Sequence, residues 1–458
     1  MASEGPNMLL ILVDSARPNA YGAYGGVCQT PHLSRLSSEG VRFTRAFCVS
    51  PICHPARASL VTGLFPHAHG AIANRCGAGA YPYGIFESIP SVVQLLAQIG
   101  YRCGYAGQRH ISVPGFHDDR AIPTATYRER LKMQGFAEEP LPDRKFNACG
   151  RTPYDIELAR DTGFARAAVS LLREYASLKQ PWFIQCDFDG PHPPCFVPHP
   201  YDTIYDPAAL PLPENLRDPL TDKPTTHISC RMAQGSGAWT DDQWRVFLVH
   251  YYGMITMLDV LVGRLLDELD ALGMAENTVV VFSSDHGGVV GGHGLLYHGT
   301  PALFEEGLRV PLVMRWPCGW ASGLREELVS HVDLLPTFLD LAGAALPEKC
   351  HGRSLLPLLT GSPVAGWRDD IYAAFNGDGV LGYTTRAIRT ADWKYVFHPF
   401  SFDELYDLQV DPHEMRNRLH DPACAQALET MRARLDARMK EIDDPVHRLG
   451  LWRSRLAR

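Results

Sequence analysis

Short apolar runs alternate with segments of helical periodicity along most of the 458-residue chain, and this alternation limits its fold more than any other feature. The apolar runs are residues 9–13, 102–106, 182–188 and 278–283, and the helical segments are residues 90–98, 156–176 and 241–272. Apolar strands separated by helices are typical of a parallel sheet that is covered on both faces. We therefore expect an α/β fold with one large, mainly parallel sheet flanked by helices.

Polar or ionisable residues follow each of the four apolar runs. They are Asp14 after the first run, Gln108 and His110 after the second, Asp189 and His192 after the third, and Asp285 and His286 after the fourth. In open α/β sheets, ligands bind at the edge where the carboxyl ends of the parallel strands meet. Four strand ends that deliver aspartate and histidine to one edge predict a single polar site there.

The sequence changes character after residue 361. Three short apolar runs separated by turns and one charged amphipathic segment follow, at residues 371–375, 384–389, 393–397 and 424–442. Short strands joined by turns are typical of an antiparallel sheet. We expect a main α/β domain over residues 1–361 and a smaller α+β subdomain over residues 362–458, with a short antiparallel sheet and a terminal helix.

Charge and composition exclude several classes of function. A net charge of −8 argues against a surface that binds nucleic acid or an anionic membrane. The first seven residues lack the basic and apolar stretches of a signal peptide, and the apolar run that follows is too short to cross a bilayer. We therefore expect a cytoplasmic protein.

The cysteine content points to a reduced protein without a structural metal. Twelve cysteines are scattered through a long chain, which favours reduced core residues over a disulfide framework. No cluster of cysteine and histidine has the spacing of a zinc finger. We therefore expect no structural zinc.

Cys53 opens the segment Cys-His-Pro-Ala-Arg-Ala-Ser-Leu-Val-Thr-Gly. Pro55 suits the first turn of a helix, where its missing N–H leaves no hydrogen bond unmade. Cys53 would then lie at the N-terminus of this helix, where free N–H groups and the helix dipole favour anions. Arg57 lies four residues further on and shares a helix face with Cys53. Taken alone, the pattern fits either an anion site or a buried cysteine beside an arginine.

The Cys-x-Pro-x-Arg core and the following Leu-Val-Thr-Gly resemble the signature of the sulfatases, in which the cysteine is oxidised to formylglycine. Further segments resemble this family in the same order along nearly the whole chain. They are Leu-Val-Asp14 with a following Tyr-Gly, Gly-Pro-His192-Pro-Pro, Phe-Ser-Ser-Asp285-His286-Gly, Gly-His-Gly-Leu, Arg309-Val-Pro, and Glu404-Leu-Tyr-Asp-Leu with Asp411-Pro-His-Glu. Agreement of this many ordered segments is far more specific than any single motif.

The resemblance implies a formylglycine at position 53 that hydrates to a geminal diol. One hydroxyl attacks sulfur or phosphorus and expels the alcohol, and deprotonation of the second hydroxyl then restores the aldehyde and releases the anion. The resemblance also implies one divalent cation, held by Asp14, Asp285, His286 and Cys53. Oxygen-rich ligation favours calcium, with manganese or magnesium as alternatives. Ser15 stands where the family commonly has a second aspartate, which leaves room for manganese.

The same resemblance implies roles for further residues. Arg57 would hold the transferring group and position residue 53, His110 would assist release of the anion, and His192 would contact the substrate. Asn74 could reach the oxyanion. Other histidines in these segments are assigned structural or supporting roles, and they are His67, His69, His199 and His293.

Two positions depart from the family pattern. Gln108 and His298 stand where the family usually has lysines that contact the sulfate or the leaving oxygen. The site therefore carries less positive charge, which argues against a dianionic phosphomonoester and fits a monoanionic ester. We expect Gln108 to bind substrate and His298 to assist departure of the alcohol. An unperturbed imidazole titrates at about pH 6.5, so we expect the rate to fall on the alkaline side of neutrality.

The leading functional hypothesis is hydrolysis of the sulfate ester of a small organic molecule. A phosphonate monoester or phosphodiester hydrolase with the same nucleophile is one alternative, and a catalytically inactive sulfatase-like binding protein is another. The expected partners are a small anionic ester and an enzyme that converts Cys53 to formylglycine. The basic tail over residues 447–458 is a candidate contact arm for a homo-oligomer.

Overall fold

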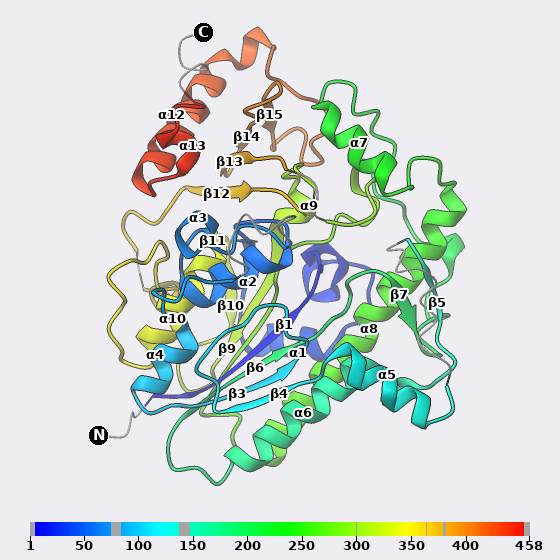
Figure 1. The fold of residues 1–458 in the computed structure, drawn as a ribbon, viewed down its shortest axis with the longest axis vertical. Helices are drawn as coiled ribbons and strands as arrows, with labels where there is room; N and C mark the ends of the chain where they lie inside the picture. The colour runs from blue at the N-terminus through cyan, green and yellow to red at the C-terminus, as the bar shows by residue number, and fades with distance from the viewer. Residues whose placement is uncertain are drawn as a thin grey trace.

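The four apolar runs form neighbouring strands at the centre of a nine-stranded sheet (Figure 1). The structure is a computed structural model that describes residues 5–74, 84–136, 147–298, 300–362, 364–378 and 382–452. Across the sheet the strands follow the order β10 (Gly323–Arg325), β2 (Val41–Phe47), β9 (Arg309–Arg315), β8 (Thr278–Ser284), β1 (Asn7–Val13), β6 (Trp182–Asp187), β3 (Arg102–Gly107) and β4 (Asp118–Ala121), and β11 (Val329–Ser330) also pairs with β2.

Most neighbouring strands of this sheet are parallel. The pairs from β8 through β1, β6 and β3 to β4 are all parallel. β9 is antiparallel to both of its neighbours, β8 and β2. The short helix α9 (Glu305–Leu308) leads directly into β9, and the carbonyl oxygen of Gly307 accepts a hydrogen bond from Gly287, just beyond the end of β8. The chain therefore enters β9 from the edge where the parallel strands end. The predicted fold class is confirmed.

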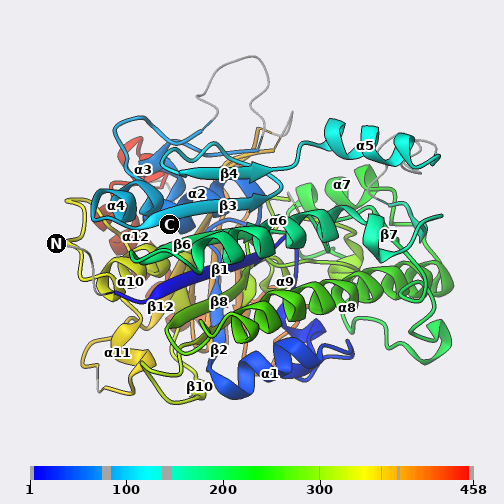
Figure 2. The same cartoon turned by 90° about the horizontal axis from the view of Figure 1, so that it is seen from below.

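Helices cover both faces of the sheet, each over its own hydrophobic core (Figure 2). One face carries α1 (Pro31–Glu39), α6 (Arg160–Tyr175) and α8 (Asp241–Ala271), and the other carries α2 (Cys53–Thr62), α4 (Val92–Gln98) and α10 (Leu334–Leu341). The predicted helical segments correspond to α4, α6 and α8. Shorter elements are α3 (Pro66–His69), α5 (Thr124–Met133), α7 (Thr225–Ala233), α11 (Leu356–Leu359), α13 (Pro445–Arg448), and a two-stranded sheet of β5 (Cys149–Arg151) and β7 (Cys195–Val197).

α8 has 31 residues and is a core helix. A capping box starts it, in which the side chains of Thr240 and Gln243 each accept a hydrogen bond from the backbone N–H of the other. Length and composition alone would allow α8 to cross a membrane, but 83% of its most apolar window is buried inside the protein. Gly253 permits a close approach in the middle of α8, because a Cβ there would lie 2.0 Å from the carbonyl oxygen of Tyr201.

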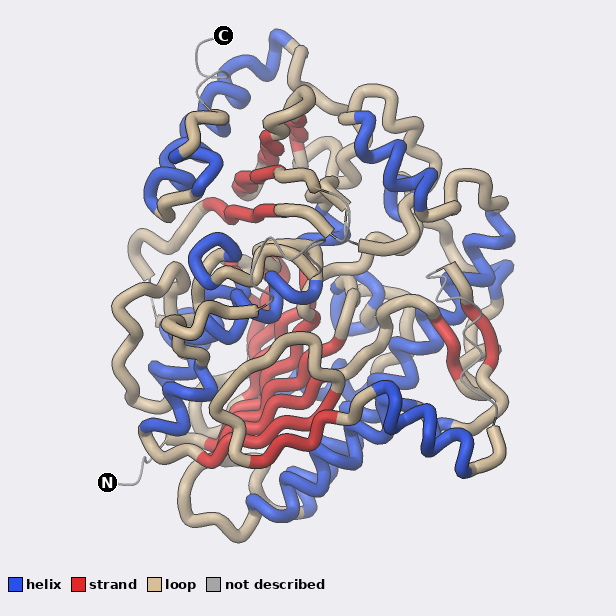
Figure 3. Tube along the Cα trace, viewed as in Figure 1, coloured by secondary structure: helices blue, strands red, loops and turns tan. Residues whose placement is uncertain are grey.

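The C-terminal part forms a separate sheet above the main one (Figure 3). It is antiparallel and contains β12 (Asp370–Phe375), β13 (Thr385–Thr390), β14 (Trp393–Phe397) and β15 (Glu404–Asp407), in that order. α12 (Ala425–Glu441) covers this sheet and buries Met431, Leu435 and Met439 in a third core. The predicted antiparallel subdomain is therefore present, whereas the exact boundary after residue 361 stays a prediction.

Candidate active site

Three buried aspartates lie at the carboxyl ends of neighbouring strands. Asp14 and Asp285 directly follow β1 and β8, and Asp187 is the last residue of β6. Each side chain is at most 5 % exposed. The predicted sheet topology therefore brings these strand ends together at one place, as expected from the sequence.

The segment around Cys53 forms a helix, in agreement with its sequence pattern. α2 begins at Cys53, directly after Ile52 in an extended conformation, and stops at Gly63, whose φ of 67° is left-handed. Pro55 lies in the first turn, where a proline leaves no hydrogen bond unmade. All ten residues of α2 are buried. Cys53 therefore lies at a buried helix N-terminus, where N–H groups and the helix dipole favour negative charge.

Arg57 lies one turn further along α2 and contacts all three aspartates. Its Nη2, Nη1 and Nε donate to Asp14, Asp187 and Asp285, each at 2.9 Å. The arginine side chain is only 2 % exposed. Buried charges are stable only when they are paired and hydrogen-bonded, so Arg57 holds the three carboxylates in place. Its predicted contact with the transferring group stays a prediction.

Asp187 was not anticipated from the sequence. Besides Arg57, its carboxylate accepts hydrogen bonds from Gln185 Nε2 at 2.9 Å and from the Tyr105 hydroxyl at 3.2 Å. Burial raises the pKa of Asp187, although Arg57 and the other donors oppose that shift. The sequence did carry one signal for Asp187. Gln185 and Asp187 are two residues apart in an otherwise apolar strand, so their polar side chains lie on the same face of it.

The four predicted metal ligands converge at the start of α2. The ligand atoms of Asp14, Cys53, Asp285 and His286 all lie within 4.8 Å of one another. Cys53 Sγ is 3.3 Å from His286 Nε2 and 3.8 Å from Asp14 Oδ1. His286 Nδ1 lies 2.9 Å from the carbonyl oxygen of Gly287, to which it can only donate, so the lone pair of Nε2 faces the other ligands. Two carboxylates and an imidazole in this orientation fit a divalent cation.

The same surroundings set the charge state of Cys53 and Asp14. Burial, together with the carboxylates of Asp14 and Asp285, raises the pKa of the Cys53 thiol well above its usual range. Burial also opposes ionisation of Asp14, but nearby histidines and Arg57 hold the pKa of Asp14 well below its usual range. The stable form of Cys53 is therefore the thiol, which is a poor nucleophile compared with a thiolate.

Ser15 and His298, two residues that depart from the family pattern, contact each other beside Cys53. Ser15, whose φ of 62° is left-handed, donates from Oγ to Asp14 Oδ1 at 3.1 Å. Its Oγ lies 2.9 Å from His298 Nδ1, and His298 Nε2 lies 3.6 Å from Cys53 Sγ. Burial, with His286 and another histidine nearby, lowers the pKa of His298 well below its usual range. Burial therefore favours the neutral imidazole of His298, whereas the expected fall of the rate above neutral pH stays a prediction.

His192 and Asn74 also lie next to Cys53. The rings of His192 and His298 meet edge to face with centroids 4.8 Å apart, and ligand atoms of both lie within 4.8 Å of Cys53 Sγ. Asn74 Oδ1 accepts a hydrogen bond from the backbone N–H of His54 at 2.8 Å, and its side chain also hydrogen-bonds Cys53. The structure thus places both residues beside Cys53, while their roles stay predictions.

Polar contacts connect His110 to Gln108 through Asp189 and Arg160. His110 Nε2 lies 3.7 Å from both Asp14 Oδ2 and Asp189 Oδ1. Arg160, the first residue of α6, donates from Nη1 to Asp189 at 2.8 Å and from Nη2 to the side-chain oxygen of Gln108. A positive charge therefore lies beside the glutamine that replaces the family lysine. No local motif signals Arg160, because its position depends on how α6 packs against β3. The predicted contact of Gln108 with substrate stays a prediction.

The strand ends and α2, with all their site residues, lie inside a segment that matches a known family. Residues 6–344 match the family described as Sulfatase. The chain belongs to the sulfatase family. Residues 291–441 of this sulfatase match a second family, described as N-sulphoglucosamine sulphohydrolase, C-terminal. Membership makes the protein an enzyme of the sulfuric ester hydrolase class, as its sequence predicts.

Relatives and solved structures resemble this sulfatase over nearly its whole length. It is 29% identical to the uncharacterized sulfatase YidJ of Escherichia coli (strain K12), over 96% of this chain and 88% of the relative. It is 28% identical to the choline-sulfatase of Rhizobium meliloti (strain 1021), over 92% of this chain and 84% of the relative. The solved phosphonate monoester hydrolase of Silicibacter pomeroyi has the same fold, with a TM-score of 0.83 and 24% identity over 96% of each chain.

Proposed function

We propose that this sulfatase hydrolyses the sulfate ester of a small organic substrate, with formylglycine made from Cys53 and one divalent cation. The observation that carries the proposal is the set of groups around Cys53 Sγ. His286 Nε2, His298 Nε2 and Asp14 Oδ1 lie 3.3, 3.6 and 3.8 Å from it. A nucleophile at this position touches metal ligands on one side and a histidine on the other.

The donor set supports one cation at this position. Asp14, Asp285 and His286 supply two carboxylates and one imidazole nitrogen, beside residue 53. Calcium is our first choice, and manganese or magnesium are the alternatives that such donors also accept. When bound, the cation and the formylglycine hydrate supply Lewis-acid polarisation and an attacking hydroxyl, which are the chemistry that a buried thiol lacks.

The protein's own residues position and solvate the reacting groups. Arg57 keeps Asp14 and Asp285 fixed through its 2.9 Å hydrogen bonds, so these ligands need little rearrangement. His298 is held through its Nδ1 by Ser15, and its Nε2 faces residue 53. Because Ser15 Oγ donates to Asp14, it accepts from His298 Nδ1–H, and a neutral His298 presents the lone pair of Nε2 to residue 53. That nitrogen can take a proton from a hydroxyl at position 53 and then donate it to the ester oxygen that departs.

Mass spectrometry of the peptide that contains residue 53, combined with an aldehyde-reactive probe, tests the proposal. We expect the aldehyde in protein produced together with a maturation enzyme, and turnover of a sulfate ester in proportion to it. Cys53→Ala should abolish turnover and leave the circular dichroism spectrum unchanged, whereas Cys318→Ala, at an exposed cysteine, should leave turnover unchanged. Full activity of protein with an unmodified thiol at position 53 would contradict the proposal.

A phosphonate monoester or phosphodiester is the second candidate substrate. Its support is the replacement of both expected lysines by Gln108 and His298, which removes charge that a dianion would need. Arg160 lies beside Gln108 but is paired with Asp189, so it adds no net charge there. A phosphonate monoester and a sulfate ester are both monoanions at neutral pH, so this charge balance accepts either. A panel of aryl sulfates, alkyl sulfates and phenyl phosphonates ranks the two by kcat/KM. Preference for the phosphonate by more than tenfold would replace the first proposal by the second.

A further inference from the structure

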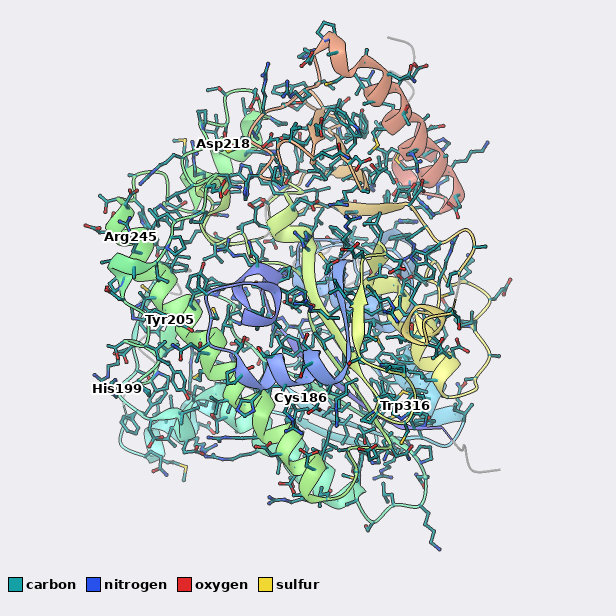
Figure 4. The ribbon with its side chains drawn as sticks, turned by 180° about the vertical axis from the view of Figure 1, so that it is seen from behind. Cys186, His199, Tyr205, Asp218, Arg245 and Trp316 are labelled. Atoms are coloured by element: carbon teal, nitrogen blue, oxygen red, sulfur yellow. The ribbon has the colours of Figure 1, made fainter. Side chains whose placement is uncertain are left out.

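A second group of buried ligand residues lies away from the proposed catalytic site, where the C-terminal subdomain packs on the main domain. It consists of His293, in the loop after β8, Glu306 in α9, and Glu414, beyond β15. Their side-chain nitrogen and oxygen atoms lie within 4.8 Å of one another. His293 and Glu414 are fully buried, and the side chain of Glu306 is 13 % exposed. Figure 4 labels the neighbouring Asp218, beside the C-terminal subdomain.

The imidazole of His293 is oriented as a metal ligand would be. Its Nδ1 lies 2.6 Å from Oδ2 of Asp218, a buried carboxylate that also pairs with Lys223 at 3.0 Å. The ring stacks on Phe304 with centroids 3.6 Å apart, which fixes its plane. Because Nδ1–H donates to Asp218, the lone pair of Nε2 points to the two glutamates. Metal-binding histidines characteristically have a carboxylate partner on the second nitrogen.

The facing atoms have few partners of their own. His293 Nε2 and Glu306 Oε2 are buried and form no hydrogen bond within the described parts of the chain. They face each other at 4.0 Å, which is too long for a hydrogen bond. Glu306 Oε1 is held by Asn215 Nδ2 at 2.6 Å, so the carboxylate cannot turn without losing that bond. Buried polar atoms without a partner are rare and call for an explanation.

Glu414 is the third member of the group and comes from the C-terminal subdomain. Its Oε2 accepts a hydrogen bond from the backbone N–H of Glu305 at 2.7 Å, and its Oε1 contacts the ammonium of Lys394. A carboxylate oxygen has two lone pairs, so the contact with Lys394 leaves one available. Glu414 and His293 also have left-handed backbones, with φ of 54° and 53°. Such backbone strain is found mostly at functional sites.

We propose that His293, Glu306 and Glu414 bind a second divalent cation of the zinc class, separate from the proposed catalytic cation. One imidazole nitrogen and two carboxylates, without the further oxygen that residue 53 would supply at the proposed catalytic site, suit zinc, and then manganese, better than calcium. Zinc holds its ligands about 3.4 Å apart at bond lengths of about 2.1 Å. The side chains would therefore close on the ion by about 1 Å or less. A water would complete the coordination.

A buried water is the competing occupant, and it satisfies the group less well. One water could donate its two hydrogens to His293 Nε2 and Glu306 Oε2, since Glu414 Oε1 already contacts Lys394. It would bring no positive charge to the carboxylate of Glu306. A cation satisfies all three lone pairs and offsets the repulsion between two carboxylates. Because His293 and Glu306 belong to the main domain and Glu414 to the C-terminal part, this ion would link the main domain to the C-terminal part.

This site would overturn two sequence-based expectations. His293 was assigned a structural role, and no structural zinc was expected because no cysteine or histidine cluster has zinc-finger spacing. The proposed ligands are 13 and 108 residues apart along the chain, so only the fold brings them together.

Zinc content of variants tests the proposal without relying on activity. Asp285→Asn weakens the catalytic cation site, so zinc retained by this variant reports on other sites. After incubation with zinc and gel filtration, we expect about one zinc per Asp285→Asn chain by plasma mass spectrometry. Adding Glu306→Gln, which keeps the size and the Asn215 contact, should weaken zinc binding at least tenfold. Adding Asp218→Asn should weaken it about 10–100-fold, because that carboxylate orients His293.

A matched substitution and a crystallographic measurement complete the test. Adding Glu268→Gln, at a surface ion pair with Arg173, should leave the zinc content unchanged. Anomalous scattering at the zinc edge from crystals of the full wild-type chain should give a peak between His293, Glu306 and Glu414, which decides the matter even if a variant misfolds. No zinc in Asp285→Asn, equal zinc with and without Glu306→Gln, or an anomalous map without a peak at this position would each overturn the proposal.

Discussion

Removal of the Arg57 guanidinium should destabilise this sulfatase strongly and in a pH-dependent way. Arg57→Ala leaves the carboxylates of Asp14, Asp187 and Asp285 buried without their shared cation, to which each is hydrogen-bonded at 2.9 Å. Loss of one partner of a buried ion pair costs about 3–5 kcal/mol. We take this range as the expected loss, because protonation of one carboxyl relieves part of the repulsion among the three.

The expected shift in melting temperature follows from the size of the chain. Unfolding entropy is about 2.1 cal/mol/K per residue, or about 1 kcal/mol/K for 458 residues. A loss of 3–5 kcal/mol therefore lowers Tm by about 3–5 °C. Arg173→Ala is the matched control, because this arginine also forms two charged hydrogen bonds, to Glu268 at 2.7 and 2.8 Å, but is 65 % exposed. An exposed ion pair contributes little to stability because water and salt screen it, so the control should shift Tm by about 1 °C at most.

The pH dependence gives a second, independent readout. Burial opposes ionisation of Asp14, but His192, Arg57 and other histidines depress the pKa of its folded state, so Asp14 stabilises the fold above its unfolded pKa of about 3.9. That contribution is lost as the pH falls. Without Arg57 the folded-state pKa rises, so the gap between variant and wild type should be widest near pH 7 and narrow toward pH 4. Differential scanning calorimetry with chelator present excludes metal binding. A shift equal to that of Arg173→Ala, or a gap that does not change with pH, would refute the reasoning.

Three further predictions address the cation, the leaving group and the packing of α8. Asp285→Asn should weaken calcium binding at least about tenfold by isothermal titration, and an unchanged affinity would place the cation elsewhere. His298→Ala should lower kcat/KM by about 10²-fold or more for alkyl sulfates but little for nitrophenyl sulfate, and equal losses would show that His298 does not assist departure of the alcohol. Gly253→Ala should destabilise the fold by about 1–3 kcal/mol in urea, because its Cβ would lie 2.0 Å from the Tyr201 carbonyl oxygen, whereas Gly382→Ala, in open space, should be neutral.

The centre of the fold could be predicted because its signals are local. Four apolar runs became the adjacent strands β8, β1, β6 and β3, since strands buried on both faces need continuous apolar sequence. β9 escaped prediction for a physical reason. Pro311 lies inside it, and a proline normally argues against a strand in the middle of a sheet. Its carbonyl oxygen is still used there and accepts a hydrogen bond from Ser283 Oγ at 2.8 Å.

The site was predictable where a residue belongs to a motif and unpredictable where only packing places it. Cys53 and Asp285 lie in recognisable segments, and the structure brings them together at one sheet edge. Asp187 ends a strand without any motif, and Arg160 reaches Gln108 from a helix 52 residues further along the chain. The environment of His298 could not be predicted from the sequence either, because its lowered pKa arises from burial, with His286 and another histidine close by.

The complete burial of α2 limits when position 53 can be chemically altered. Cys53 is 3 % exposed and contacts groups that come from the residues after β8. A second enzyme therefore cannot bind this segment once β8 has been added to the folded sheet. β8 is synthesised about 230 residues after Cys53. At about 5–20 residues per second, a ribosome needs about 12–46 s to cover that distance. On the proposed chemistry, this interval is the time in which a maturation enzyme can meet an open segment, and a chain that folds first would be committed to the thiol. Slower translation should therefore raise the fraction of active molecules without any change in the amount of protein.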